Sequence, residues 1–594
     1  MKKLFTNLIA ILAMSVICFS IPHKILALAK FSTNYQINYT VAPTGITHVK
    51  FFINQKNNLS VVYATDFSLS VNNTKINNVR VVDENVVIPA DVTKTRNQTS
   101  ISFSFTNKIV GKDKNHFFSV EYDTEDVATK FGNTWQINIP KLEQDENLTD
   151  QNIILTVPPD FPKPAYIDPN PSVVINNVYY FSGSQLANKP IGAVFGLSQF
   201  FKANLDYHLV NDLDNSVEQS IALPPDTNYQ SVFIENIDPK PIRFETDEDG
   251  NLLAFYKLNA HTKLNISVAE SIKVNFRPSP EKDVPVQKYL ATNQIWDFES
   301  NIFTIPEVQN LTTPKAIYDY VSDKLNYDYQ KVNQNQSQHY SASESLKNSS
   351  SAICTDFTNV FVALARKTGI PAREIEGYAF SENSDLKPLS LTQDVLHAWP
   401  EYYDQDKHTW IQVDPTWANT THGVDYFNKL DLNHITFVIH GIDPFSPVSA
   451  GGYKVGSSKT KDVDIQPLNE ISFPDPTIEI KSVDQNNDKI EITFKNVSGI
   501  GYHNDLSVEN TKYFTSYTAP IVIAPFTEKK IEMDLINRPY LKPVGIKAII
   551  YLNGQRLERN LTIQPLIPTF ALLSGAVVIL GSVALTARRI HFRR

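Results

Sequence analysis

The chain has 594 residues, enough for about four domains of roughly 150 residues each. Hydrophobic residues make up 42% of it and charged residues 20%, a balance typical of globular proteins and unlike that of disordered chains. The net charge of −9 is spread out without a basic stripe, which excludes nucleic acid as an expected partner, and no phosphate-binding glycine motif indicates a nucleotide cofactor.

The N-terminus has the pattern of a secretory signal peptide. A short basic start is followed by an apolar run over residues 8–19 and by small residues up to Ala29, so we predict that residues 1–29 are removed. One of the two cysteines, Cys18, lies in this segment, which leaves Cys354 as the only thiol of the mature chain. A lone cysteine in an exported protein cannot form an internal disulfide, and this favours a reactive thiol; a bridge between two chains is the alternative.

Two β-rich segments are predicted next. Apolar and polar residues alternate along 101–105 and 118–122, as in half-buried strands, and no long helical pattern intervenes, so we predict a β-sandwich over residues 30–165. Prolines crowd residues 158–171 and indicate a stiff connection. A second β-rich domain is predicted over residues 172–280, including a hairpin that turns at residues 247–250.

The middle of the chain offers a candidate nucleophile. Cys354 precedes apolar residues at helical spacing, from Phe357 to Ala365, and Gly369 closes the run, so we predict that Cys354 opens a helix. The positive end of the helix dipole favours thiolate, which lowers the pKa of such a thiol from its free value of about 8.5. The free N–H groups at the same place suit an oxyanion.

Two later motifs offer a base and its partner. His397 begins the run His-Ala-Trp-Pro-Glu-Tyr, and Asp414 follows Trp-Ile-Gln-Val. Both runs have strand character, and a β-hairpin turning at residues 404–407 would place the two side chains together. A thiol nucleophile needs a base to take its proton and a third group to hold that base. The three residues therefore indicate a Cys-His-Asp site.

This order of motifs resembles the core of the transglutaminase-like superfamily, whose papain-like α+β fold uses Cys, His and Asp in the same order. The predicted helix at residues 316–321 also resembles the helix that precedes the nucleophile in that family. Over residues 285–440 the resemblance implies Cys354 as nucleophile, His397 as base and Asp414 as the residue that orients it. Where many members have Gly two residues before the Cys, this chain has Ala352. The β-domains ahead of this core resemble the layout of prokaryotic cell-surface members.

Each site residue also has a structural interpretation. A buried cysteine is usually a small core residue, a histidine beside Trp399 is often only packed there, and an Asp-Pro pair often starts a turn. His408 and His422 are the rivals for the role of base, although both lie in predicted polar turns. A metal site is not indicated, because the mature chain has one cysteine and scattered histidines without ligand spacing, and no cofactor is expected.

The C-terminal part suggests a spacer and an anchor. Glycines and prolines over residues 441–476 indicate a linker, and residues 477–565 an immunoglobulin-like β domain. Residues 566–587 are apolar enough for a single transmembrane helix, and Arg588, Arg589, Arg593 and Arg594 follow in a basic tail over residues 588–594. The positive-inside rule then places residues 30–565 outside the cell and the tail in the cytoplasm.

The sequence thus predicts a multidomain protein: N-terminal β-sandwiches, a central α+β papain-like core, a C-terminal β-sandwich and one membrane helix. We expect a membrane-anchored extracellular thiol enzyme that acts on amide bonds of a protein or peptide at the cell surface. Its thioester would be resolved by water, as in a peptidase or amidase, or by an amine, as in a transamidase. The alternative is a non-catalytic adhesion or scaffold protein with an inactive core.

Overall fold

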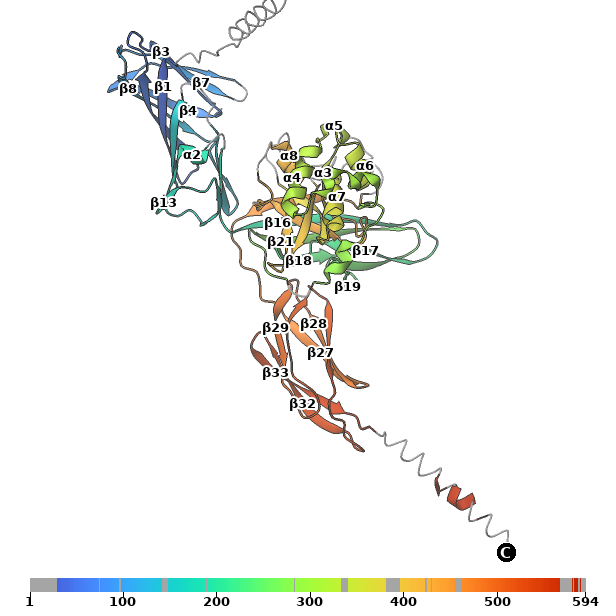
Figure 1. The fold of residues 1–594 in the computed structure, drawn as a ribbon. Helices are drawn as coiled ribbons and strands as arrows, with labels where there is room; N and C mark the ends of the chain where they lie inside the picture. Colours follow the sequence, from blue (N-terminus) through green and yellow to red (C-terminus); the bar gives the residue numbers. More distant parts are fainter. Residues whose placement is uncertain are drawn as a thin grey trace, which may run out of the picture. The chain divides into compact units, whose positions relative to one another are not determined.

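The protein is β-rich and multidomain, with few helices (Figure 1). The computed structural model describes residues 29–73, 75–95, 98–141, 148–186, 190–281, 284–332, 340–380, 396–421, 425–428, 430–454 and 461–566, with 579, 580, 582–585 and 588. Contacts divide the chain into two compact units, one of residues 1–131 with 135–196 and the other of residues 132–134 with 197–594. Each unit is described by itself.

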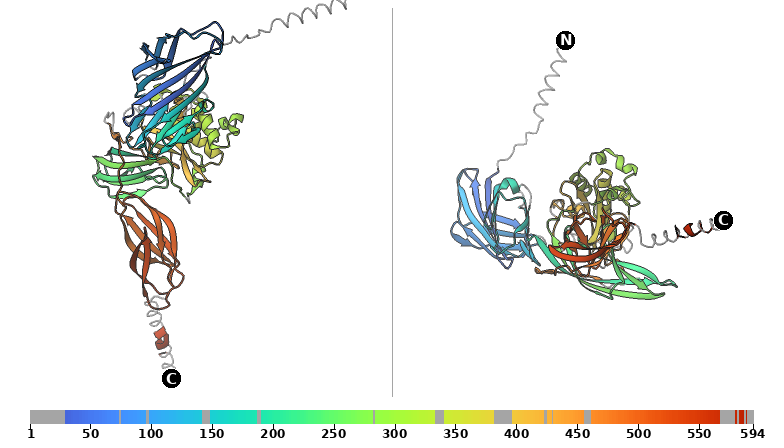
Figure 2. Two further views of the ribbon diagram at one scale, coloured as in Figure 1. Left: turned by 90° about the vertical axis from the view of Figure 1, so that its left-hand side faces the viewer. Right: turned by 90° about the horizontal axis from the view of Figure 1, so that it is seen from below.

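The described residues of the first unit form β-strands and one short helix. Among its described residues the strands form sheets ordered β13-β14-β11-β1-β2-β8-β4-β5, β12-β15-β10-β9 and β3-β7-β6. Its elements are β1 Phe31–Val41, β2 Thr47–Asn57, β3 Asp66–Val71, β4 Ile76–Asp83, β5 Val86–Ile88, β6 Asp91–Lys94, β7 Thr99–Ser104, β8 Asn115–Thr124, β9 Ala128–Phe131, β10 Thr134–Ile139, β11 Leu148–Thr156, β12 Pro164–Asp168, β13 Val173–Ile175, β14 Val178–Phe181, α2 Gly183–Leu186 and β15 Ile191–Phe195. Figure 2 shows the long strands of the large sheet side by side.

This unit extends past the boundary that we predicted at residue 165. Strand β14 pairs with β11, and β15 pairs with β10, so the strands after the prolines complete sheets begun before them. Phe181, Ile191 and Phe195 belong to the same hydrophobic core as Ile37 and Val120. The predicted proline-rich connection contains β12, which starts at Pro164 and forms the edge of its sheet, where a missing N–H is tolerated.

The second unit begins with another set of β strands. One sheet has the order β18-β21-β16-β26 and a second has the order β17-β20-β19. The strands are β16 Ser198–Asn211, β17 Val217–Leu223, β18 Gln230–Asp238, β19 Arg243–Thr246, β20 Leu252–Leu258, β21 Thr262–Asn275 and β26 Val463–Leu468. The predicted hairpin at residues 247–250 joins β19 to β20, with Gly250 in the left-handed region at a φ of 97°. Strand β26 lies within the linker predicted over residues 441–476, so part of that segment is sheet.

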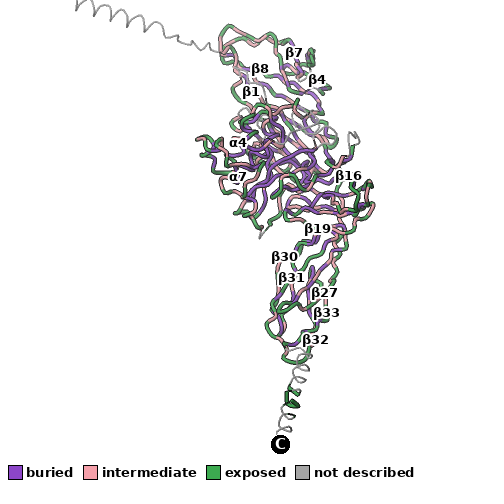
Figure 3. Tube along the Cα trace, turned by 90° about the vertical axis from the view of Figure 1, so that its right-hand side faces the viewer, coloured by how far each residue is buried: buried purple, intermediate pink, exposed green. Residues whose placement is uncertain are grey.

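Between β21 and β26 the chain forms a small α+β region. Its helices are η1 Val286–Leu290, η2 Asn301–Thr304, α3 Pro306–Gln309, α4 Pro314–Lys324, α5 Tyr329–Val332, α6 Ala342–Lys347, α7 Cys354–Lys367 and α8 Pro415–Thr420. An antiparallel sheet ordered β24-β23-β22-β25 consists of β22 Ala372–Ala379, β23 Leu396–Asp404, β24 Thr409–Gln412 and β25 His434–His440. Helix α7 packs on β23, where Phe361 faces Tyr402 with ring centroids 6.4 Å apart. In Figure 3 the buried residues are dense in the region of α7.

Local chemistry explains why these segments fold as predicted. Helix α4 begins at Pro314 after Thr313, whose hydroxyl accepts the N–H of Ala316, and it buries Ile317 and Val321 one turn apart. Helix α7 ends before Gly369, whose φ of 80° few other residues adopt. Both helices and the β23–β24 hairpin confirm the elements that we predicted around the three motifs.

The last domain of this unit is a β-sandwich. Its sheets have the orders β27-β28-β31 and β30-β29-β32-β33. The strands are β27 Ile478–Asn486, β28 Lys489–Asn496, β29 Tyr502–Val508, β30 Tyr517–Ile523, β31 Glu528–Asp534, β32 Val544–Leu552 and β33 Gln555–Ile563.

The two ends of the chain fall mostly beyond the part that the structure describes. The predicted signal peptide lies there except for Ala29, and so does most of the predicted span over residues 566–587. Within the described residues, no helix is long and apolar enough to cross a membrane. The signal peptide, the anchor and the resulting topology therefore stay predictions.

Candidate active site

Cys354 is the first residue of α7 and is buried. The side chain of Asp356 fixes this helix start by accepting the N–H of Ile353 at 2.8 Å. The carboxylate of Asp356 also accepts the hydroxyl of Ser345 at 2.9 Å and pairs with Lys331 at 2.6 Å. The negative charge of Asp356 beside the cysteine is therefore matched by a cation.

Ala352 is accommodated in the position where many family members have glycine. Its N–H donates to the carbonyl oxygen of Asn326 at 3.0 Å, and its own carbonyl oxygen accepts the N–H of Asp328 at 2.8 Å. Its side chain is 1% exposed and belongs to the core that contains Phe357. The backbone of Ala352 thus holds the segment around Tyr327 next to the cysteine.

Register places two histidines on one face of the sheet. Strand β22 lies between β23 and β25, with His397 opposite Gly377 and His434 opposite Ala379. Positions two apart on a strand point to the same face, so both imidazoles project from the same side of this sheet. Glycine is required at 377, because a Cβ there would meet the backbone oxygen of Ile435 at 2.0 Å.

His397 and Asp414 form a buried hydrogen-bonded pair. The Nε2 atom of His397 lies 3.0 Å from Oδ2 of Asp414, and both side chains have no exposed surface. Asp414 caps α8, because its Oδ1 accepts the N–H of Trp417 at 3.0 Å. The His397 ring stacks on Trp417, with centroids 5.1 Å apart and planes inclined by 20°. With Nε2 held by Asp414, Nδ1 is the ring nitrogen left for the thiol.

The charges of this pair are stabilised in the folded protein. Burial by itself lowers the pKa of His397, but the charge and hydrogen bond of Asp414, followed by the interaction with Cys354, raise it to about 9. Burial raises the pKa of Asp414, but the two nearby imidazoles hold it well below its usual range.

His434 is a third group on the same carboxylate, and we did not predict it. Its Nε2 lies 3.4 Å from Oδ2 of Asp414, and its Nδ1 lies 2.8 Å from Oδ1 of Asp431. Potential ligand atoms of His397, Asp414 and His434 lie within 4.8 Å of one another, a spacing that a metal ion can bridge. Hydrogen-bond lengths connect each histidine to a carboxylate, so we interpret the cluster as held together by protons.

The predicted residues come together, whereas their rivals do not. Cys354 contributes to the raised pKa of His397, and His397 pairs with Asp414. His408 is exposed in the turn between β23 and β24, and His422 lies outside the described residues. The order of motifs revealed the first three residues. His434 carried no sequence signal, because only the register of β25 against β22 brings it to Asp414.

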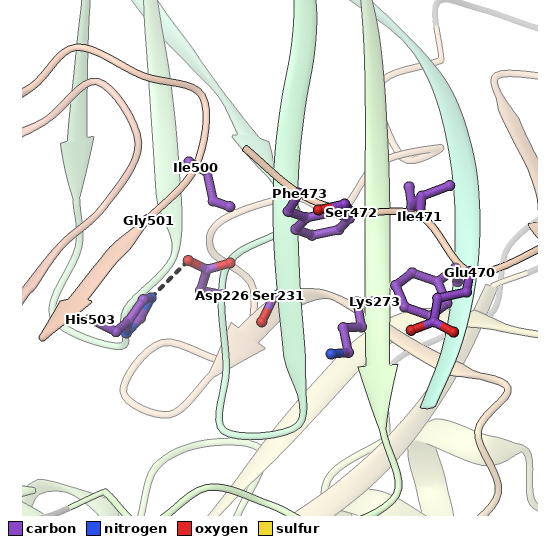
Figure 4. A pocket seen from close by; sticks show the side chains of 11 residues that line it. Asp226, Ser231, Lys273, Glu470, Ile471, Ser472, Phe473, Ile500, Gly501 and His503 are labelled. Atoms are coloured by element: carbon purple, nitrogen blue, oxygen red, sulfur yellow. Dashed lines mark hydrogen bonds and ion pairs between the residues drawn. The ribbon is translucent and has the colours of Figure 1, made fainter. Parts of the chain in front are cut away.

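A separate pocket of about 610 Å³ lies elsewhere in the second unit (Figure 4). Ser231, His503 and Asp226 all line it, and His503 Nε2 lies 2.9 Å from Asp226 Oδ2. In the described part of the chain, no hydrogen bond joins Ser231 to His503, so these residues do not form a serine triad. The group around Cys354 remains the candidate active site.

The two buried imidazoles make stability depend on pH. The pKa of His397 and that of His434 are each raised from 6.5 to about 9. Their stabilising contribution is complete below pH 6.5 and is lost as the pH rises through about 9. We expect unfolding free energy to fall across that range, by roughly 1.4 kcal/mol per pH unit for each histidine that remains protonated only when folded.

Denaturant unfolding from pH 6 to 9.5 measures this dependence. The control variant His397→Gln retains His434 and should show a shallower decline than the wild type. Equal declines in the two chains would contradict the assignment of a raised pKa to His397.

A thiol at a helix start, an antiparallel sheet that carries His397, and Asp414 at the start of α8 make this region an α+β fold. Residues 303–415 match the sequence model of the transglutaminase-like superfamily. This part of the chain belongs to that superfamily, which confirms the resemblance inferred from the motifs.

Individual relatives are distant. The chain is 29% identical over 122 residues to the uncharacterised protein YebA of Bacillus subtilis, which covers 20% of this chain and 13% of that protein. Among solved structures, it is similar to a candidate cysteine protease from Cytophaga hutchinsonii, with a TM-score of 0.33, 18% identity, and coverage of 47% of this chain and 94% of that one. It is also similar to the periplasmic domain of TgpA from Pseudomonas aeruginosa, with a TM-score of 0.21, 15% identity, and coverage of 37% and 91%.

Proposed function

We propose that this protein is a thiol enzyme that forms a thioester between Cys354 and an acyl group taken from an amide bond of a protein or peptide. The observation that carries the proposal is the buried 3.0 Å contact between His397 Nε2 and Asp414 Oδ2, which leaves the other ring nitrogen for the thiol. A group of three residues placed in this way has the components of an activated nucleophile.

The proposed first step breaks the amide. The Cys354 thiolate attacks the carbonyl carbon, and a C–S bond forms as the carbonyl oxygen becomes an oxyanion. His397, held as an imidazolium by Asp414, gives its proton to the departing nitrogen as the C–N bond breaks. An amine or ammonia leaves, and the acyl group remains on sulfur.

The second step breaks the thioester and regenerates the Cys354 thiolate. His397 takes a proton from water or from an acceptor amine, and that nucleophile attacks the thioester. The C–S bond breaks and either a carboxylic acid or a new amide is released. Both reactions use the same three residues, so the acceptor that reaches the thioester decides between hydrolysis and transfer.

Trapping the acyl group tests the proposal. Residues 30–565 would be incubated with a glutamine-containing peptide, with and without hydroxylamine, and the products identified by mass spectrometry. A free acid or a hydroxamate, with ammonia released and Cys354 transiently acylated, supports the enzyme. Absence of any acylation of Cys354 across several protein and peptide substrates would favour the alternative, a scaffold protein with an inactive core.

Tyr327 is expected to contribute a hydrogen bond to the acylation step. Its hydroxyl is buried and, within the described residues, has no hydrogen-bond partner, although a buried hydroxyl ordinarily has one. Burial, followed by the charge of Cys354, raises the pKa of this tyrosine, so the hydroxyl is a neutral donor, and Tyr327 forms a β-bridge with Ala352, two residues before the cysteine. A carbonyl oxygen that becomes negative at Cys354 would be its missing partner.

Tyr327→Phe removes only this hydroxyl. We expect acylation of Cys354 by an amide to slow by about 10²-fold, the usual effect of losing one oxyanion donor. Alkylation of the same thiol by iodoacetamide involves no oxyanion and should keep its rate. A variant that is acylated as fast as the wild type would exclude this role.

A further inference from the structure

His434 lies between two carboxylates. It is the first residue of β25 and has no exposed side-chain surface. Its Nδ1 lies 2.8 Å from Oδ1 of Asp431, and its Nε2 lies 3.4 Å from Oδ2 of Asp414. A neutral imidazole has one N–H, so at one of these contacts a lone pair would face a carboxylate oxygen. Only an imidazolium can donate at both nitrogens.

The surroundings of His434 favour the charged ring. Its ring lies 4.9 Å from that of Trp399 and 4.6 Å from that of Trp417, which exclude water on two sides. The tyrosines beside these carboxylates, Tyr426 and Tyr318, keep their protons because burial raises their pKa, and so add no charge. Among the described residues, the remaining titratable groups in the cluster are Asp431, Asp414, His397, Cys354 and Tyr327, and burial raises the pKa of Tyr327 as well.

The balance of charges in the cluster also favours a protonated His434. Asp414 Oδ2 faces both imidazoles, and Asp431 faces one. With both rings protonated, each carboxylate has a cation. If His434 were neutral, Asp431 Oδ1 would face an uncharged ring at 2.8 Å, and of the two imidazoles at Asp414 Oδ2 only His397 would carry a charge.

We propose that His434 is a positioning residue that carries a lasting positive charge behind Asp414, and that this charge sets the pH range in which the Cys354–His397 pair reacts. This role of His434 in catalysis rests on the proposed thiol chemistry of Cys354. His434 acts through Asp414 and His397, and no bond to substrate is assigned to it.

The positive charge of His434 should lower the pH at which Cys354 loses its proton and the pH at which His397 loses its proton. The rings of His434 and His397 lie 5.7 Å apart. A cation in this cluster favours loss of the thiol proton and also favours loss of the His397 proton. Removing it should therefore shift both transitions to higher pH, that of His397 by about two pH units at the effective dielectric constant of roughly 20 that describes buried sites.

The test is the rate of Cys354 alkylation by iodoacetamide from pH 5 to 11 in wild type, His434→Gln and His440→Gln. Glutamine can still donate to Asp414 but carries no charge. His440 is another buried histidine of β25, at the opposite end of the strand, and its Nε2 contacts the carbonyl oxygen of Pro447. We expect both transitions to move up in His434→Gln, that of His397 by about two pH units, and to stay in place in His440→Gln.

Two outcomes distinguish this idea from a purely structural role. Unmoved transitions with a lower rate would mean that His434 only supports the fold, and would overturn the proposal. Alkylation needs no substrate, so a failure to find amide cleavage would affect the proposed function without deciding the role of His434.

A second measurement leaves His434 unchanged, so it gives a result even if His434→Gln fails to fold. In the His397→Gln chain labelled with ¹⁵N-histidine, His434 is the histidine that faces Asp414. His116 and His440 are also buried, so the signals of His434 are assigned by the proximity of its ring to Trp399 and Trp417. At pH 8 we expect this ring to carry both N–H groups. A single N–H on it would show that His434 is neutral and would overturn the proposal.

Discussion

Cys354→Ala and His397→Ala are each expected to reduce amide-dependent acylation to the background rate, a loss of up to about 10⁶-fold for residues that act as one unit. The first removes the sulfur that forms the bond, and the second removes the group that carries the proton to the leaving nitrogen. The double variant should be no worse than either single one, because each loss already disables the same step. Release of the amine product, measured against time, gives all three rates.

His408→Ala is the matched control for this experiment. His408 is exposed in the β23–β24 turn and was a rival for the role of base, so its loss should leave the rate unchanged. Loss of activity in His408→Ala with full activity in His397→Ala would reverse the assignment. Wild-type turnover in Cys354→Ala would show that the reaction does not pass through this thiol.

The elements that carry the predicted site were visible in the sequence because each is locally encoded. Apolar spacing from Phe357 to Ala365 belongs to one helix, and the β23–β24 hairpin joins strands that are adjacent in the chain. A local signal of this kind needs no knowledge of distant contacts. The same holds for the Asn553-Gly554 turn, where both residues have positive φ, between β32 and β33.

Contacts between distant segments could not be predicted in this way. His434 and Asp414 meet only because β22 lies between β23 and β25 in a particular register. The pair of Arg373 and Glu401 is similar: both side chains are buried, and the guanidinium lies 3.9 Å from the ring centre of Trp410. Sequence patterns treat charged residues as exposed, so a buried ion pair gives no signal before the strands are aligned.

Proline explains two strands that the sequence analysis assigned to connections. Pro164 starts β12 and Pro467 lies in β26, and each of these strands forms the edge of its sheet. Proline lacks an N–H and is tolerated at an edge, where one side of the strand has no neighbour. The density of prolines therefore led to the prediction of a connection in both segments. In each of them the chain instead adds an edge strand to a sheet whose other strands lie far away in the sequence.

Asp414→Asn is expected to lower both activity and stability. The carboxylate accepts from two buried imidazoles and from the N–H of Trp417. Both imidazoles contact Oδ2, and the Trp417 N–H contacts Oδ1, so the NH₂ group of an amide must face either both imidazoles or the Trp417 N–H. Removing one member of a buried ion pair typically costs about 3–5 kcal/mol, and an amide that fixes the wrong imidazole tautomer costs about 10⁴-fold in a related triad.

Activity in Asp414→Asn should nevertheless exceed that of Cys354→Ala, because the nucleophile and the proton carrier both remain. Acylation rates and denaturant unfolding at pH 7 measure the two effects on the same preparation. Asp404→Asn is the matched control: it lies at the far end of the same hairpin, pairs with Lys407 at the surface, and should change stability by less than about 1 kcal/mol. An Asp414→Asn chain as stable and as active as this control would show that Asp414 neither holds His397 nor balances the charge of His434.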